Sequence, residues 1–144
     1  MNLENKIHLQ TIDPETLSVA LEKIFSNQKS EVGIEDLPEK LLAFAVFDQD
    51  KIVGGILAKQ SYESIYINLL AVDPAYREQR IGSRLMKKIE ELAIIQGTIQ
   101  ITLTTMSYQA LGFYQKQGYV VFGSLEDMPM RGVTKYYLHK RLKA

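Results

Sequence analysis

The fold is decided by one stretch of the sequence, Val72-Asp-Pro-Ala-Tyr-Arg-Glu-Gln-Arg-Ile-Gly-Ser-Arg-Leu85. An apolar run typical of a β-strand ends at Asp73-Pro74, and the amphipathic pattern of a helix begins near Ile81. The first N–H groups of a helix lack intrahelical partners, and the helix dipole adds partial positive charge there. Because arginines flank this point and Gly82 lets the backbone approach a ligand closely, the stretch is suited to bind phosphate. A plain strand-to-helix turn with solvated arginines has the same spacing.

The segment that follows has the pattern of one long helix and one strand. Its apolar face is formed by Ile81, Leu85, Met86, Ile89, Leu92 and Ala93. Gly97 is suited to end this helix, and residues 98–104 then alternate apolar and polar side chains as a strand does. Because a helix intervenes, we expect that strand to lie parallel to residues 65–72 in a right-handed crossover.

The flanking segments complete the predicted architecture. Apolar runs at residues 41–47, 52–59 and 65–72 are separated by short turns and predict an antiparallel meander. After the parallel pair, we expect a helix over residues 108–117, capped by Ser107, and strands over 119–123 and 134–139. At the start, Ile7, Leu9 and Thr11 alternate as in a strand, Asp13-Pro14 opens a helix over residues 16–25, and a short helix is expected at 34–37. The patterns predict an α+β fold whose sheet has mixed strand directions.

Composition narrows the possible functions. The 144 residues suit a single domain, 1–144, and the absence of cysteine excludes disulfides and a cysteine nucleophile. His8 and His139 are far apart, so no metal is expected. Seventeen basic and seventeen acidic residues cancel, which argues against nucleic acid or membranes as partners. Without a signal-peptide pattern or a membrane-length apolar run, we expect a cytoplasmic protein.

Two motifs resemble those of a known family. Residues 70–77, followed by Arg80-Ile-Gly82, resemble the acetyl-CoA signature of the GNAT superfamily of N-acetyltransferases. The family's loop Arg/Gln-x-x-Gly-x-Gly/Ala maps onto Arg77, Arg80 and Gly82, with arginine in place of the first glycine. Arg80 either takes a positive φ, which is uncommon without glycine, or keeps ordinary angles and contributes charge.

The second motif lies downstream, where the family has Asn-x-x-Ala-x-x-Phe-Tyr-x-x-x-Gly-Phe. Ala110, Phe113, Tyr114 and Gly118 match at the same spacing, while Ser107 stands where the family often has asparagine. The resemblance implies an α+β fold with a GNAT-like mixed, mostly antiparallel sheet of six to seven strands, helices on both faces and a central parallel strand pair. The resemblance also implies an enzyme that transfers the acetyl group of acetyl-CoA, its co-substrate, to an amine by direct attack. It implies cofactor-binding roles for Leu70, Ala71, Val72, Arg77, Glu78, Gln79, Arg80, Ile81, Gly82, Ser83, Gln109 and Phe113.

The resemblance also places Tyr114 at the position of a general acid, which would protonate the departing CoA thiolate. The alternative for Tyr114 is a core aromatic beside Phe113. No base is identifiable, because Asn68 stands where family members often have an acid. Glu63, Glu126 and Asp127 could reach the acceptor, although each is more typical of solvated surface residues.

The acceptor is expected to be an amine of a small molecule or peptide. The resemblance places its pocket at residues 16–40 and 125–133, where Met128 and Met130 either contact the amine or serve packing or dimer contacts. A homodimer is possible by analogy. Two other functions remain open: a non-catalytic acyl-CoA-binding sensor module and a nucleic-acid-binding domain, the latter disfavoured by the zero net charge.

Overall fold

The computed structural model describes residues 6–142, which divide into two compact units, one up to Leu37 and one from Pro38. In the first unit, helix α1 spans Pro14–Glu31. It begins as predicted, because the Asp13 carboxylate accepts a hydrogen bond from the Thr16 N–H at 3.0 Å. The helix runs further than the predicted residues 16–25. One domain over the whole chain stays a prediction.

Two predictions for the first unit are wrong. Residues 7–11 form no strand, because alternation defines a face but does not supply the partner strand that a ladder needs. Residues 34–37 form no helix, since so short a segment cannot offset the cost of nucleation. Instead, Gly33 takes a φ of 76°, and the Ile34 N–H closes the end of α1 by donating to the Lys29 carbonyl at 2.8 Å.

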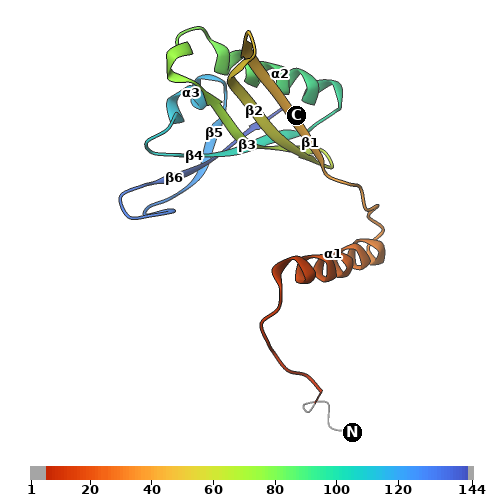
Figure 1. The fold of residues 1–144 in the computed structure, drawn as a ribbon. Coiled ribbons are helices and arrows are strands. Elements are labelled where there is room, and N and C mark those ends of the chain that lie inside the picture. The colour runs from red at the N-terminus through yellow and green to blue at the C-terminus, as the bar shows by residue number, and fades with distance from the viewer. Residues whose placement is uncertain (1–5, 143–144) are drawn as a thin grey trace. The chain divides into compact units, whose positions relative to one another are not determined.

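The second unit is built on a six-stranded sheet with the order β1-β2-β3-β4-β6-β5 (Figure 1). The first three strands form the predicted meander, and β3 pairs in parallel with β4, whereas the other described pairs are antiparallel. The strands span Lys40–Asp48 (β1), Lys51–Ser61 (β2), Ser64–Val72 (β3), Gln100–Met106 (β4), Val120–Leu125 (β5) and Lys135–Arg141 (β6). This confirms the predicted fold class, with six strands.

Helices α2 (Ile81–Ile95) and α3 (Leu111–Lys116) share one hydrophobic core with the sheet. The α2 face predicted from periodicity is buried, except that Leu92 is only partly so. Gly97, with a φ of 75°, ends α2 as predicted. Helix cover on the other face of the sheet stays a prediction.

Helix α3 is shorter than predicted, and Ser107 is not its cap. The helix begins only at Leu111, and its N-terminal cap is Ala110. Ser107 is held elsewhere, because its hydroxyl accepts from the Thr134 N–H at 3.1 Å and its own N–H donates to the Thr134 carbonyl at 2.8 Å. The serine therefore ties the loop after β4 to the start of β6.

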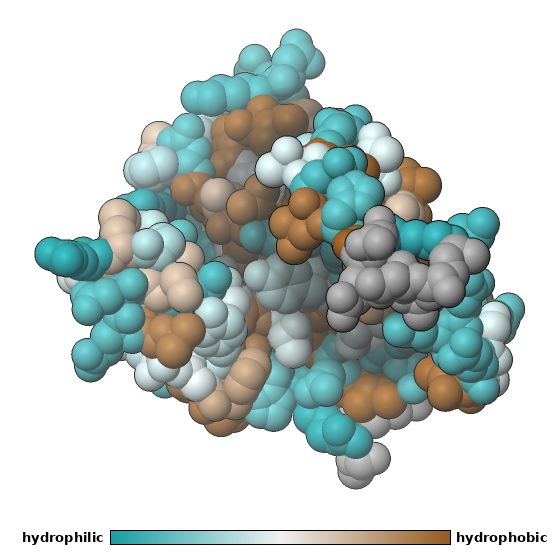
Figure 2. Space-filling view, turned by 90° about the horizontal axis from the view of Figure 1, so that it is seen from below, coloured by the Kyte–Doolittle hydropathy of each residue, from teal (hydrophilic) through white to brown (hydrophobic). Residues whose placement is uncertain are grey.

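Several large hydrophobic side chains of the sheet are exposed. They include Leu41, Phe47, Ile52 and Leu69. Leu41 and Leu69 alternate with Leu42 and Leu70, which pack in the core, so they lie on the face turned away from α2. Figure 2 shows hydrophobic side chains visible among hydrophilic ones. No described helix is long and apolar enough to cross a membrane.

Candidate functional site

The site begins where β3 and β4 stop pairing. Their parallel ladder runs from Ser64 opposite Gln100 to Ile67 opposite Leu103. Directly after this, the register between β2 and β3 shifts, which leaves Asn68 as an extra residue of a β-bulge. A bulge bends its strand and interrupts pairing locally. The edge of β3 beyond Asn68 therefore borders a cleft of about 660 Å³ instead of a neighbouring strand.

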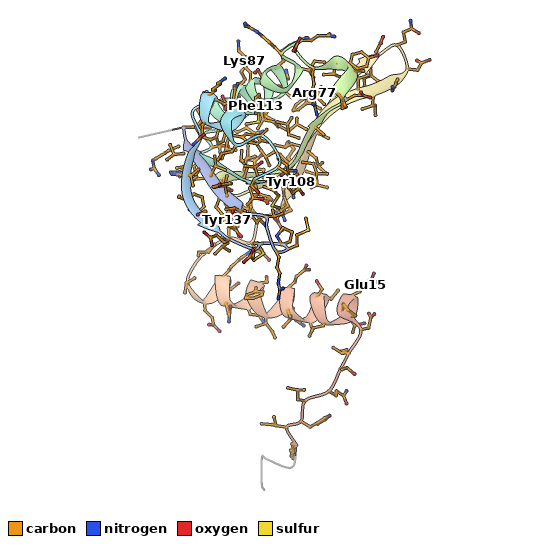
Figure 3. All side chains as sticks on the ribbon, turned by 90° about the vertical axis from the view of Figure 1, so that its left-hand side faces the viewer. Glu15, Arg77, Lys87, Tyr108, Phe113 and Tyr137 are labelled. Atoms are coloured by element: carbon orange, nitrogen blue, oxygen red, sulfur yellow. The ribbon has the colours of Figure 1, made fainter. Side chains whose placement is uncertain are left out.

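Three segments line this cleft: the end of β3, the loop before α2, and the region from the end of β4 into α3. They bring together all but one of the predicted site residues, namely Leu70, Ala71, Val72, Arg77, Glu78, Arg80, Ile81, Gly82, Ser83, Gln109, Phe113 and Tyr114. Gln79 does not line the cleft, and neither does Arg84. In Figure 3, the labelled Arg77, Phe113 and Tyr108 come from the loop before α2, from α3 and from the loop after β4.

The loop before α2 is shaped by local hydrogen bonds. The Asp73 carboxylate accepts from the Ala75 N–H at 2.9 Å and starts a single 3₁₀ turn, η2, at Pro74–Tyr76. Arg77 closes this turn by donating its N–H to the Pro74 carbonyl at 3.3 Å. The chain is thereby turned from the end of β3 toward the start of α2.

Arg80 takes the backbone conformation that glycine would favour. It is the N-terminal cap of α2 with φ 57° and ψ 27°, and Glu78 before it also has a positive φ of 69°. The Arg80 carbonyl accepts the first helical hydrogen bond, from the Arg84 N–H at 3.0 Å. Of the two possibilities left open by the sequence, the positive φ is the correct one. The unpaired N–H groups of the first turn of α2 adjoin the cleft together with the Arg77 and Arg80 side chains.

Gly82 is explained by packing between helices. A β-carbon at this position would lie 3.2 Å from Cζ and 3.5 Å from Cε2 of the Phe113 ring. The glycine therefore lets the ring of α3 sit directly on the first turn of α2. This contact joins the two halves of the cleft wall.

Tyr114 is buried, with 8% of its surface exposed, yet it lines the cleft. Its ring makes edge contacts with Phe113 and Tyr119, at centroid distances of 5.2 and 6.2 Å. Burial raises the pKa of its hydroxyl above the ordinary value for tyrosine. Among the described residues, no group accepts a hydrogen bond from this hydroxyl. Tyr114 is therefore protonated at neutral pH and free to donate.

The cleft also contains residues to which sequence reasoning gave no site role, among them Tyr76, Thr104 and Tyr108. Thr104 could have been found from period-two alternation in β4, but Tyr76 and Tyr108 lie in loops without such a signal. The Tyr76 hydroxyl donates to the Asp48 carboxylate, and this hydrogen bond raises the pKa of Tyr76. The bond links the loop before α2 to the end of β1.

The candidate bases lie outside the cleft. Glu63, Glu126 and Asp127 are not among its lining residues, and the Asp127 carboxylate accepts from the Gly132 N–H at 2.9 Å. Gln109 lines the cleft, and its side-chain oxygen accepts from the Met106 N–H at 2.8 Å. Across the described residues, no group of three or more His, Cys, Asp or Glu side chains is placed to hold a metal.

The family model of the acetyltransferase (GNAT) family matches residues 9–119. A blasticidin-S acetyltransferase of Streptomyces morookaense is 32% identical over 105 residues, 72% of this chain and 76% of that protein. The chain therefore belongs to the GNAT family and is an N-acetyltransferase.

Solved structures agree with this assignment. The crystal structure of an acetyltransferase from Bacillus cereus superposes with a TM-score of 0.84 at 28% identity, over 96% of this chain and 99% of that one. An aminoglycoside 6'-N-acetyltransferase, solved with coenzyme A, shares the fold with a TM-score of 0.65 at 21% identity, over 96% and 98% of the two chains.

Proposed function

We propose that the cleft binds acetyl-CoA, with the diphosphate at the start of α2 and the pantetheine along the free edge of β3. The observation that carries this is the end of the β3–β4 ladder at Ile67, which leaves the rest of β3 lining one cleft together with the first turn of α2. Backbone groups at Leu70 and Val72 would pair with the pantetheine amides, as a strand would. The first-turn N–H groups of α2, together with Arg77 and Arg80, suit a doubly charged diphosphate.

The chemistry proposed is direct transfer. The nitrogen of a neutral amine attacks the thioester carbon and forms the N–C bond, and the C–S bond breaks. The nitrogen then loses one proton, and the departing thiolate takes one. Tyr114 is the proposed donor, because its raised pKa keeps it protonated and its hydroxyl is free. The amine must lose its own proton before or during attack, since an alkylammonium has a pKa of about 10. The acid that lines the cleft among the described residues is Glu78, which belongs to the loop proposed to hold the diphosphate, so we assign no base.

The acceptor proposed is an amine of a small molecule or a peptide, and the blasticidin-S acetyltransferase relative favours the small molecule. Neutral overall charge supports a cytoplasmic enzyme that needs neither nucleic acid nor a membrane surface. A homodimer, and catalysis without a metal, are part of the same proposal. No observation favours a non-catalytic sensor.

Replacing Tyr114 by phenylalanine tests the mechanism. We expect Tyr114→Phe to lower kcat about 100-fold, the lower end for losing a general acid, while the Kd of CoA stays within about twofold. Thiol release from acetyl-CoA with a panel of amines measures kcat, and calorimetry measures Kd. Tyr136→Phe, at a half-buried tyrosine that does not line the cleft, is the matched control.

The pH profile adds a second criterion. Because the pKa of Tyr114 is raised, the wild-type rate should not fall through loss of the acid until the pH exceeds 10. Equal rates for wild type and Tyr114→Phe across the whole pH range would remove Tyr114 from the mechanism. Absence of any thermal stabilisation by CoA would remove the assignment of the cleft.

A further inference from the structure

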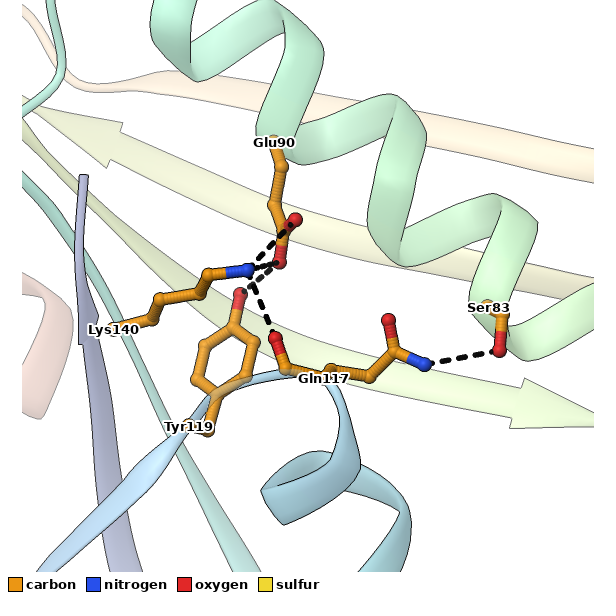
Figure 4. Close-up of polar contacts among 5 residues, drawn as sticks. All are labelled: Ser83, Glu90, Gln117, Tyr119 and Lys140. Atoms are coloured by element: carbon orange, nitrogen blue, oxygen red, sulfur yellow. Dashed lines mark hydrogen bonds and ion pairs between the residues drawn. The ribbon is translucent and has the colours of Figure 1, made fainter.

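A polar cluster joins three segments of the second unit, namely α2, the connection between α3 and β5, and β6 (Figure 4). Lys140 of β6 places its Nζ 3.2 Å from both carboxylate oxygens of Glu90 on α2, and donates to the Gln117 carbonyl at 2.8 Å. The Tyr119 hydroxyl donates to the same carboxylate at 3.1 Å. The Lys140 ammonium thus contacts three oxygen atoms, and the Lys140 and Glu90 side chains are only 28% and 16% exposed.

Lys140 holds the end of α3 through two contacts, one made by its ammonium group and one by its aliphatic stem. Gln117 is the C-terminal cap of α3, so its carbonyl is one of those that a helix leaves unpaired, and Lys140 satisfies it. The next residue, Gly118, turns the chain with a φ of 93°, and a β-carbon there would lie 3.3 Å from Cε of Lys140. The lysine stem thus packs against the turn while its charge holds the helix end.

The Gln117 side chain reaches from the end of α3 to the first turn of α2. Its Nε2 donates to the Ser83 hydroxyl oxygen at 3.0 Å. Ser83 lines the cleft in the first turn of α2, but Gln117 does not line it. A serine hydroxyl carries a single hydrogen. Because the Ser83 oxygen accepts a hydrogen bond from Gln117, the Ser83 hydrogen is available to another acceptor. Ser83 lines the cleft, so a ligand bound there could be that acceptor.

We propose that Gln117 is a positioning residue of the acetyl-CoA site. Its amide orients the Ser83 hydroxyl as a donor toward a phosphate oxygen, and the Glu90–Lys140 pair holds Gln117 in place. This inference rests on the proposed binding of the diphosphate at the start of α2. By this inference, a residue outside the cleft contributes to the affinity for acetyl-CoA.

The test compares CoA with pantetheine, which lacks the diphosphate and the nucleotide. Gln117→Ala should raise the Kd of CoA and the KM of acetyl-CoA about fivefold, which is about 1 kcal/mol, with kcat retained. The Kd of pantetheine should not change. Ser83→Ala should have the same effect, and the double variant should lose no more than either single one, because both remove one interaction. Gln115→Ala, at an exposed glutamine of the same helix, is the control that should change nothing.

A second variant covers the possibility that Gln117→Ala disturbs folding. Gln117→Glu keeps the size of the side chain but accepts hydrogen bonds and carries charge. It should draw the serine hydrogen away from the ligand and weaken CoA binding by more than tenfold, again without changing the pantetheine Kd.

The outcomes separate the two proposals. If Ser83→Ala weakens CoA binding and Gln117→Ala does not, the role of Gln117 is refuted and the diphosphate site stands. If the Gln117 variants weaken pantetheine and CoA equally, Gln117 is merely structural. If neither Ser83→Ala nor Arg77→Ala alters CoA binding, the diphosphate assignment itself fails.

Discussion

At Arg80, the backbone conformation lowers the stability of the fold, while the side chain provides a positive charge for the proposed ligand. A left-handed conformation is unfavourable by about 1–2 kcal/mol for a residue with a β-carbon. The same position places a cationic side chain on the wall of the cleft, where a diphosphate would be bound. The arginine thus combines an unfavourable backbone conformation with a charge that suits the ligand.

Two substitutions separate these effects. Arg80→Gly and Arg80→Ala both remove the charge, so both should weaken CoA binding by the same several-fold factor. They should differ in stability, because alanine keeps the β-carbon in the left-handed region while glycine does not. We expect Arg80→Gly to be more stable than Arg80→Ala by about 1 kcal/mol in urea unfolding. Equal stabilities would show that the loop relaxes and that φ at position 80 carries no strain.

The limits of sequence reasoning are visible at this residue. The spacing of Arg77, Arg80 and Gly82 located the loop, and the cleft contains all three. It did not decide the conformation of Arg80, because φ depends on how η2 and α2 are joined. Nor did it reveal why residue 82 is glycine, since the reason is a ring that lies 31 positions later in the sequence, on Phe113.

Between elements, the contact of α2 with α3 depends on the space at Gly82. Replacing glycine by alanine within a helix is worth up to about 1 kcal/mol in helix propensity. At Gly82 a β-carbon would press on the Phe113 ring, whereas at Gly112 nothing lies within 4 Å of it. The two glycines therefore form a matched pair, one crowded and one open.

Gly112→Ala should raise the free energy of unfolding by about 0.5–1 kcal/mol and leave CoA binding unchanged. Gly82→Ala should be less stable than Gly112→Ala, because its β-carbon presses on the Phe113 ring. It should also raise the Kd of CoA, because this ring lines the cleft and must move. Adding Phe113→Leu to Gly82→Ala should restore part of the lost stability. Chemical denaturation and calorimetry give both quantities; a Gly82→Ala variant as stable as Gly112→Ala and with normal affinity would contradict the packing argument.

Elements with strong periodicity could be predicted, and elements defined by their partners could not. The buried face of α2 and the meander of β1–β3 follow from local patterns, which the structure confirms. The strand expected at residues 7–11 has the right alternation but no pairing, and the start of α3 is delayed because Ser107 bonds to Thr134. In both cases a distant segment decides the outcome. The bulge at Asn68, which opens the cleft, has no sequence signal of its own.

Across the second unit, the cluster of Tyr119, Glu90 and Lys140 joins α2 to β6 and to the residue directly before β5. Tyr119 and Lys140 lie 29 and 50 residues from Glu90 in sequence, so no local pattern predicts the cluster. Tyr119 is 2% exposed. Burial, followed by the negative charge and the hydrogen bond of Glu90, raises the pKa of its hydroxyl strongly. The folded state therefore favours the protonated hydroxyl.

This raised pKa makes stability depend on pH. Below the unfolded value of about 10, Tyr119 is protonated in both states and its contribution is fully present. Above it, the unfolded chain releases the proton and the folded chain does not, so the free energy of unfolding falls by about 1.4 kcal/mol per pH unit from this group.

Tyr119→Phe lacks that proton. We expect the variant to be about 1 kcal/mol less stable than wild type at pH 8, through loss of the hydrogen bond to Glu90, and to lose less stability above pH 10. Urea unfolding at intervals from pH 8 to 11 measures both curves, which should converge and then cross; parallel curves would show that Tyr119 ionises as easily in the folded protein as in the unfolded chain.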